Sequence, residues 1–456
     1  MTGKAKFIIS DTHLGAGHYW EGNVLEDFIS DEDFAHWIDA LIAESEADGV
    51  EMELIINGDF LELLQVPATD TFDPVEAYPP EAYAPTHEVA AVRKIHHVLA
   101  GHEPFFAALR RFISAARPRR SVTINKGNHD PELYWPLVQA ALRGALAANG
   151  DRAELLRFPS IGVSREGIYV EHGNQYTENI NRYTDFAEPL DPERPGELER
   201  VPGSRFVYEF FNGLERERPW IDGVSPLTAL IWYAFAFDTA FALRALFTLL
   251  KAAPGLIAGE LGIRGTAEAT ALLDELSNED QQIRLAQELD EDPAFRDAFL
   301  RRVVQATSPL EPAVAEMLER RTPTSIDPFE VAQDIQHRYT EILAQEAGRI
   351  ARETGAMVVS FGHTHRPVVR PLPNGGVYIN SGTWVWRGDF AGADREVWRD
   401  LFEHPERYSE ARELTYVRID YDDNGTPRGE LCTLPSAQRA PSQERRGCLG
   451  WIWGKR

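Results

Sequence analysis

The chain has 456 residues, 43% of them hydrophobic and 26% charged, which fits a folded protein of two or three domains and excludes disorder over the whole length. Its formal net charge of −26 argues against a broad nucleic-acid footprint, because an acidic surface repels phosphate backbones. Its two cysteines, Cys432 and Cys448, are too few for a disulfide framework or a four-cysteine metal site.

Short apolar strands alternate with helical patterns in the first part of the chain. No apolar stretch of signal-peptide length precedes the first strand, so we expect a cytoplasmic protein. Strands are predicted at residues 6–10, 51–57 and 121–126, and helices at 31–47, 87–116 and 137–148, the second helix being broken near Gly101. Residues 66–88 contain five prolines and five acids without a Lys or Arg, which predicts a solvated loop. Three closely spaced strands are expected at 154–158, 162–165 and 168–171.

Strand patterns stop near residue 176 and return near residue 357, and helical periodicity dominates between them. The later strands are predicted at residues 357–361, 376–380, 414–421 and 428–433, with a hairpin turn at 422–425. A β/α core that is left and re-entered predicts one core domain, residues 1–178 and 355–435. A helical insertion or cap would occupy residues 179–354, and residues 436–456 would form a separate tail.

Five short polar motifs lie at the ends of predicted strands or in the loops that follow them. They are Asp11–Thr12–His13, Gly58–Asp59, Gly127–Asn128–His129–Asp130, His172–Gly173 and Gly362–His363–Thr364–His365. Ligands of open α/β sheets bind outside the carboxyl ends of the strands, so these loops could converge on one site. Each motif alone is compatible with an ordinary turn. As a set they predict a metal site, and oxygen and imidazole ligands without thiolate suit Mn, Fe or Zn.

The motifs resemble, in type and order, those of the calcineurin-like metallophosphoesterase superfamily, over residues 4–178 and 355–433. The resemblance implies an α/β fold, namely a four-layered αββα sandwich of two mixed sheets, here with a large helical insertion. It also implies a binuclear centre of two divalent metal ions. One ion would be held by Asp11, His13, Asp59 and His365, and the other by Asp59, Asn128, His172 and His363, so that Asp59 bridges them.

The same resemblance implies a hydrolase of a phosphoester or pyrophosphate bond, in which a metal-bridging hydroxide attacks phosphorus. His129 would protonate the leaving group, a role that suits imidazole near neutral pH. Glu62 and Asp130 are the two candidates for the carboxylate that orients His129. Two divalent ions bring a charge of +4 against −2 from Asp11 and Asp59, so the site would attract phosphate within an acidic protein.

Residues 362–367 and 380–384 are also similar to the UDP-2,3-diacylglucosamine pyrophosphatases, but two positions depart from that branch. Those enzymes typically carry Arg where this chain has His129 and Asp where it has Asn174, and the insertion here is longer. The substrate therefore stays open. Two alternatives remain: a lipid-linked nucleotide-sugar pyrophosphatase acting at the membrane surface, and a catalytically silent scaffold of the same fold.

Two segments bear on membrane contact. Residues 226–261 are unusually apolar, which predicts either a buried core helix of the insertion or a surface for a lipid tail. The tail places basic residues among Trp451 and Trp453, which is typical of a membrane headgroup region, although a disordered or docked tail is the alternative. The expected partner is a phosphorylated small molecule or a lipid-linked substrate, not an extended nucleic acid. Peripheral contact with the inner membrane face would use the insertion or the tail.

Overall fold

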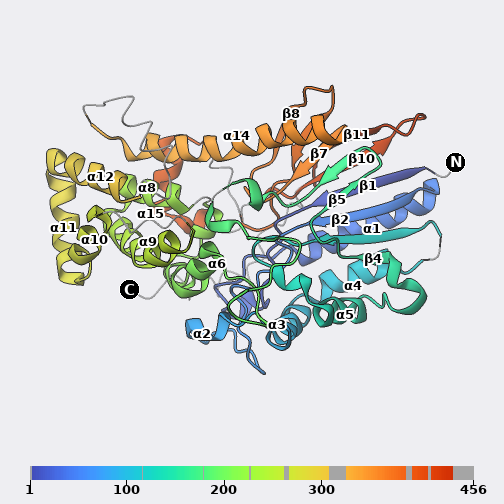
Figure 1. The fold of residues 1–456 in the computed structure, drawn as a ribbon, viewed down its shortest axis with the longest axis horizontal. Coiled ribbons are helices and arrows are strands. Elements are labelled where there is room, and N and C mark those ends of the chain that lie inside the picture. The colour runs from blue at the N-terminus through green and yellow to red at the C-terminus, as the bar shows by residue number, and fades with distance from the viewer. Residues whose placement is uncertain are drawn as a thin grey trace. The chain divides into compact units, whose positions relative to one another are not determined.

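The computed structural model describes residues 3–115, 117–177, 179–224, 227–260, 267–307, 325–386, 393–408 and 412–434 (Figure 1). The chain divides into two compact units. The first comprises residues 1–204, 341–388 and 409–456, and the second comprises residues 205–340 and 389–408. The predicted C-terminal tail lies outside the described residues.

Two mixed sheets form the centre of the first unit. The larger has six strands in the order β11-β10-β1-β2-β3-β4, and the smaller has five in the order β5-β6-β7-β9-β8. Strands β1 to β4 are parallel, as are β6, β7 and β9, while the other pairings are antiparallel. The larger sheet consists of β1 (Lys4–Ile9), β2 (Glu51–Asn57), β3 (Arg120–Asn125), β4 (Leu156–Arg157), β10 (Thr415–Tyr421) and β11 (Pro427–Thr433). The smaller consists of β5 (Val163–Arg165), β6 (Ile168–Val170), β7 (Val358–Phe361), β8 (Val368–Pro371) and β9 (Val377–Asn380).

Helices cover the outer face of each sheet. Those on the larger sheet are α1 (Asp31–Asp48), α3 (Glu88–Gly101), α4 (Glu103–Phe112) and α5 (Pro136–Ala145), which Figure 1 shows on one side of it. The smaller sheet packs against the end of α14 (Pro328–Thr354) through Leu343 and Ile350. The first unit is therefore a four-layered αββα sandwich, which confirms the predicted fold class.

The last three residues of β1, Phe7, Ile8 and Ile9, are buried on both faces of the sheet. Phe7 and Ile9 point into the core beneath the helices, whereas Ile8 points into the core between the two sheets. Successive side chains of a strand face opposite sides, so a stretch that meets an apolar core on each face has apolar residues in succession.

The strand register brings the polar motifs to one end of the sandwich. Ile9 pairs with Ile56, and Asn57 pairs with Asn125, so β1, β2 and β3 end at the same level. In the smaller sheet, Val170 pairs with Ser360 in parallel β6 and β7. The loops that follow these strands consequently start from shared edges.

The strand β8 was not predicted. It is a four-residue edge strand that ends at Pro371, and edge positions are where a sheet tolerates proline. The break near Gly101 is present, because α3 ends at that residue and α4 begins at Glu103. The loop of residues 66–88 contains only the short helix α2 (Pro80–Tyr83).

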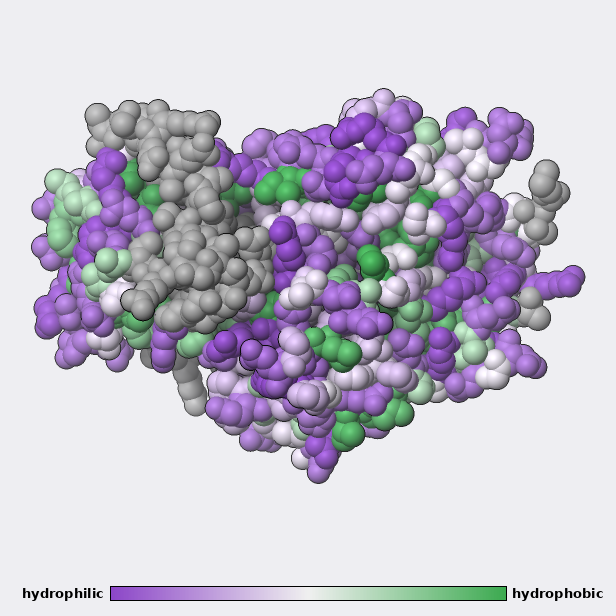
Figure 2. Space-filling view, in the orientation of Figure 1, coloured by the Kyte–Doolittle hydropathy of each residue, from purple (hydrophilic) through white to green (hydrophobic). Residues whose placement is uncertain are grey.

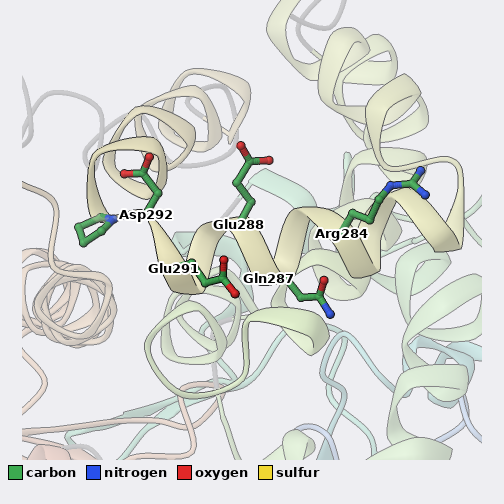
Figure 3. Close-up of a pocket in the computed structure, with 6 residues that line it drawn as sticks. Arg284, Gln287, Glu288, Glu291 and Asp292 are labelled. Carbon is green, nitrogen blue, oxygen red and sulfur yellow. The ribbon is translucent and has the colours of Figure 1, made fainter.

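The second unit is helical in its described part. Its helices are α7 (Asn212–Glu217), α8 (Leu227–Phe237), α9 (Thr239–Glu260), α10 (Ala267–Glu275), α11 (Glu279–Glu291), α12 (Pro293–Thr307) and α15 (Arg395–Glu403), and α6 (Pro202–Phe206) and α14 cross its boundary. Short helical turns lie at Tyr19–Glu21, Pro131–Tyr134, Gly150–Leu155, Asn174–Tyr176, Asn179–Asn181, Val207–Phe211, Ile221–Gly223 and Pro405–Arg407. Figure 3 shows a hollow along α11, where Arg284, Gln287, Glu288 and Glu291 lie on one face.

The units differ in their bounds from the predicted core and insertion. Residues 179–204 lie in the sandwich unit, where Gln175 hydrogen-bonds the backbone of Tyr183. Residues 389–408 lie in the helical unit because Trp398 stacks on Tyr233, with ring centroids 3.6 Å apart. Such a long-range ring contact leaves no local pattern in the sequence.

Most of the described apolar side chains in the apolar segment of the second unit are buried. Leu230 and Tyr233 of α8 and Phe241 and Leu246 of α9 are fully enclosed. None of the helices in the described ranges combines a bilayer-spanning length with sufficient apolar character. Hydrophilic residues cover most of the face in Figure 2, as the net charge of −26 leads one to expect.

Candidate metal centre

Five loops bring the predicted ligands together at the carboxyl ends of β1, β2, β3, β6 and β7. Within the described chain, eight non-glycine residues have positive φ, and five of these are predicted ligands: Asp11, His13, Asp59, His363 and His365, with φ between 44° and 68°. A left-handed conformation costs a residue with a side chain about 1–2 kcal/mol. Strain that gathers at one place points to a function, since it persists only where the surrounding structure holds it.

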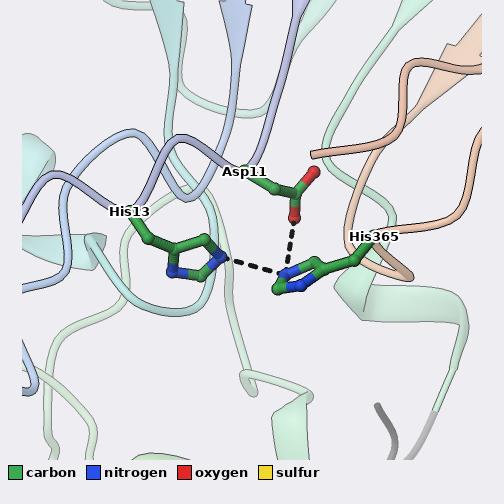
Figure 4. Close-up of side chains that lie close together, drawn as sticks. All are labelled: Asp11, His13 and His365. Carbon is green, nitrogen blue, oxygen red and sulfur yellow. Dashed lines mark hydrogen bonds and ion pairs between the residues drawn. The ribbon is translucent and has the colours of Figure 1, made fainter. Parts of the chain in front are cut away.

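Asp11, His13 and His365 form the first group of potential ligands, and Figure 4 shows their polar ends turned toward one another. Nε2 of His13 lies 3.0 Å from Nε2 of His365, which in turn lies 3.4 Å from Oδ1 of Asp11. Two nitrogen ligands about 2.1 Å from one ion would be about 3.0–3.4 Å apart for right-angled to tetrahedral coordination. The pair of imidazoles therefore has a spacing that fits a shared metal ion.

Asp59, His172 and His363 form a second group, and Asn128 adjoins it. Nε2 of His172 lies 2.9 Å from Oδ2 of Asp59 and 3.2 Å from Oδ1 of Asn128. The rings of His172 and His363 have centroids 5.1 Å apart. All four side chains are buried, so the polar atoms gather where water has little access.

Neighbouring acceptors set the tautomers of two imidazoles. Nδ1 of His172 lies 3.1 Å from the backbone oxygen of Asn57, and Nδ1 of His13 lies 2.7 Å from Oε2 of Glu62. A carbonyl or a carboxylate can only accept, so each Nδ1 carries a proton and each Nε2 faces the site, where it would offer a lone pair to a metal once its own proton has left. Metal-binding histidines are commonly oriented in this way.

His129 lies beside the centre and shares a carboxylate with His13. Its Nδ1 is 2.6 Å from the same Oε2 of Glu62, and its backbone N–H donates to Oδ1 of Asp59 at 2.9 Å. The His129 side chain is 20% exposed, whereas that of His13 is 2% exposed. His129 is therefore the imidazole of this pair that a molecule arriving from solvent could reach.

Of the two predicted partners of His129, Glu62 contacts its imidazole, with its Oε2 2.6 Å from Nδ1. Asp130 instead accepts three backbone N–H groups, from Phe60 at 2.8 Å, Leu61 at 3.1 Å and Gly127 at 2.6 Å. Asp130 thus joins the loop after β2 to the loop after β3. This contact holds two ligand loops together.

At two motif positions only glycine fits, because the carboxylate of another loop lies too close for a Cβ atom. A Cβ atom on Gly127 would lie 2.0 Å from Oδ1 of Asp59, and one on Gly362 would lie 2.4 Å from Oδ2 of Asp11. Real Cβ atoms essentially never approach other atoms so closely. The glycines of these motifs therefore make room for the carboxylates of neighbouring loops.

Several supporting residues were not identified as functional from the sequence. Thr383 donates to the backbone oxygen of Asp11 at 2.7 Å, and Asn380 donates to that of Gly362 at 2.7 Å. The hydroxyl of Thr177 lies 2.8 Å from Nε2 of His363. The segment 380–384 had been noted only for its resemblance to one branch, and its contacts show that it fixes two ligand loops.

The carboxylates and imidazoles of the site shift one another's pKa values. Burial alone would raise the pKa of Asp59, but the imidazoles of His172 and His129 hold it well below its usual range. Burial likewise opposes ionisation of Glu62, yet His129 beside it lowers the pKa of Glu62 to about 2. Burial disfavours a charged His172, whereas Asp59 raises its pKa to about 9. Without a metal, protons on imidazole thus supply the positive charge that these carboxylates require.

The donor set fits a metal ion. It combines buried carboxylates, an amide oxygen and imidazoles, which is the chemistry of borderline divalent ions. A metal would take over the charge that a protonated His172 provides, so binding would release a proton. The seven predicted ligand positions all lie at this end of the sandwich.

The comparisons with known proteins add no name to this site. No protein-family model matches the chain, and no match to it was found among curated proteins.

Proposed function

We propose that this protein is a hydrolase of a phosphoester or pyrophosphate bond that works with two divalent metal ions, Mn, Fe or Zn. One observation carries the proposal: three groups of His and Asp atoms overlap, sharing His13 and Asp59. Overlapping groups support adjacent positions for two ions, for which Asp59 would be the shared ligand. The resemblance of the five motifs to the calcineurin-like metallophosphoesterases supports the same reaction class.

When bound, two such ions would supply Lewis acidity and lower the pKa of a coordinated water. The side chains of the chain itself would position the substrate and move protons. His129 would act as the general acid, because Glu62 holds its Nδ1 and the side chain is partly open to solvent. Glu62 would act as a positioning residue that aligns His129 and the ligand His13 at once.

The substrate class rests on electrostatics. An acidic protein of net charge −26 repels long polyanions, and a small metal-bearing pocket is the place where a single phosphate group would be attracted. A phosphorylated small molecule is therefore the proposed substrate. A lipid-linked nucleotide sugar is a more specific candidate for this substrate. If the protein cleaves no phosphoester, it would instead be a catalytically silent scaffold.

The first test is the substitution His129→Ala. We expect it to lower kcat on p-nitrophenyl phosphate or its diester by about 10²–10⁴-fold, the usual contribution of a general acid, with metal content unchanged. Asp59→Asn should lose both metal and activity, and the exposed His96→Ala serves as the matched control. Metal analysis accompanies each assay. Full activity of His129→Ala would remove its catalytic role, and inactivity of the metal-loaded wild type on mono-, di- and pyrophosphate substrates would favour the scaffold.

A further inference from the structure

A second polar hollow lies at the amino ends of the strands, opposite the candidate metal centre. It has a volume of about 310 Å³ and is lined by the first residues of β1 and β2, by Arg119 and Ser121 around the start of β3, and by Arg157 and Arg165. The seven-residue strand β2 runs between the two ends, which places them about 20 Å apart. Since a water molecule occupies about 30 Å³ of liquid, the hollow has room for a phosphate-sized anion with several waters.

The sign of the charge in this hollow is opposite to that of the whole protein. Its cationic lining is Lys4, Lys6, Arg119, Arg157 and Arg165, and its carboxylates are Glu51, Glu53 and Glu166. Five cations against three carboxylates leave an excess of two positive charges in a chain of net charge −26. Arg119 also pairs with Glu154 at 3.1 Å, but an exposed pair of this kind is weak in water.

The carboxylates in the hollow are already held by the cations around them. Glu53, 6% exposed, contacts Lys6, Arg165 and Arg157. Burial alone would raise the pKa of Glu53, but Lys6 lowers it. The pKa of Glu166 falls to about 2, because hydrogen bonds from Lys6 and Lys4 outweigh its partial burial. Both acids therefore stay ionised in a locally positive field.

The two arginines retain donors for a further anion. Glu53 is contacted by Nη1 of Arg157 at 3.3 Å and by Nη2 of Arg165. The same Nη1 of Arg157 also lies 3.5 Å from the hydroxyl of Ser121. A guanidinium has five N–H donors in a planar fork, so these contacts leave most of each fork available. The Arg157 and Arg165 side chains are 33% and 40% exposed, so solvent reaches both. Such forks match the oxygens of phosphate groups in a bidentate manner.

We propose that this hollow is an anion site, separate from the metal centre, that binds a phosphate group through Arg157 and Arg165. Lys4 adds a third positive charge at its rim. The ligand is either free inorganic phosphate or the phosphate group of a larger molecule.

The test is isothermal titration of inorganic phosphate into full-length protein that has been stripped of metal by a chelator and then desalted. Without metal, the predicted active site contributes little, so the result does not depend on the proposed enzymatic function. We expect saturable binding at one site, weakened at least tenfold in the double variant Arg157→Gln/Arg165→Gln. Arg349→Gln is the control, because Arg349 has a similar exposure of 43%, pairs with glutamates (Glu346 and Glu353), and does not line the hollow.

A second variant should change the phosphate affinity in the opposite direction. Glu51 is an exposed carboxylate of the lining, so Glu51→Gln should tighten phosphate binding by about threefold without disturbing the core. A parallel titration with glycerol 3-phosphate separates the two sources: equal affinity indicates the free anion, and tighter binding indicates a larger phosphorylated molecule. Absence of saturable binding in the wild type, or equal binding by the double variant, would overturn the site.

Discussion

At the scale of single residues, the candidate centre depends on the motif glycines, which have no side chain, as much as on the ligand side chains. The ligands occupy strained left-handed conformations, and neighbouring loops approach so closely that Cβ atoms are excluded at Gly127 and Gly362. The motif glycines and the ligands thus form one packed arrangement. A methyl group added at either glycine would displace the carboxylate beside it.

We expect Gly127→Ala to abolish metal binding while the protein stays folded. The added methyl group would meet Oδ1 of Asp59 at 2.0 Å and displace the carboxylate that both ion positions share. Metal content after dialysis against Mn or Zn measures the effect. Gly144→Ala in α5 is the control, because no atom lies within 4 Å of its Cβ, and it should be neutral or stabilising by up to about 1 kcal/mol. Full metal loading of Gly127→Ala would show that the loop adapts.

At the scale of elements, the sequence revealed the strands and the ligand loops because both leave local patterns. The last residues of β2 before Asn57, Leu54, Ile55 and Ile56, are an apolar run buried on both faces, and the ligand loop begins just after it. The edge strand β8 was missed because it is short and largely exposed. The shared role of Glu62 and the contacts of Thr383 could not be predicted, since they join segments that are distant in the sequence.

One junction of elements depends on a buried charge. His102, between α3 and α4, places Nδ1 3.1 Å from Asp31 at the start of α1 and Nε2 3.3 Å from Glu26. Glu26 also accepts backbone N–H groups of Gly15 and Gly17, in the loop that follows His13. Burial disfavours a charged imidazole, but Glu26 raises the pKa of His102 to about 10. The protonated ring therefore fastens this loop to the helices.

We expect His102→Gln to destabilise the protein in a pH-dependent way. The pKa is raised on folding from 6.5, so this stabilisation is complete below pH 6.5 and is lost as the pH rises toward 10. The variant should lose about 3 kcal/mol of unfolding free energy at pH 6, as for a broken buried ion pair, and less at pH 9.5. Urea unfolding of both proteins at the two pH values measures this, with the exposed His96→Gln as control. A loss of equal size at both pH values would show that packing, not charge, is responsible.

At the scale of the whole molecule, the predicted ligands come from both sheets. Asp11, Asp59 and Asn128 follow strands of the larger sheet, and His172 and His363 follow strands of the smaller one. Ions held by these residues would join the sheets at one end of the sandwich, while the apolar cluster around Ile8, Ile55 and Val358 joins them along their length. Metal binding should therefore stabilise the fold of the first unit, not only equip it for chemistry.

Metal removal should accordingly loosen the sandwich and spare the helical unit. An ion present at about 100 times its Kd stabilises the folded state by about 2.7 kcal/mol, which should raise Tm by several degrees. Hydrogen exchange resolves where the change occurs: a chelator should speed exchange in β1 and β7 and leave α10 to α12 unchanged. Asp59→Asn, which lacks the shared ligand, should show fast exchange with or without the chelator. Equal exchange of wild-type β1 and β7 in both states would mean that the sheets are held by their apolar core alone, because the ions would then bind a site that is already rigid.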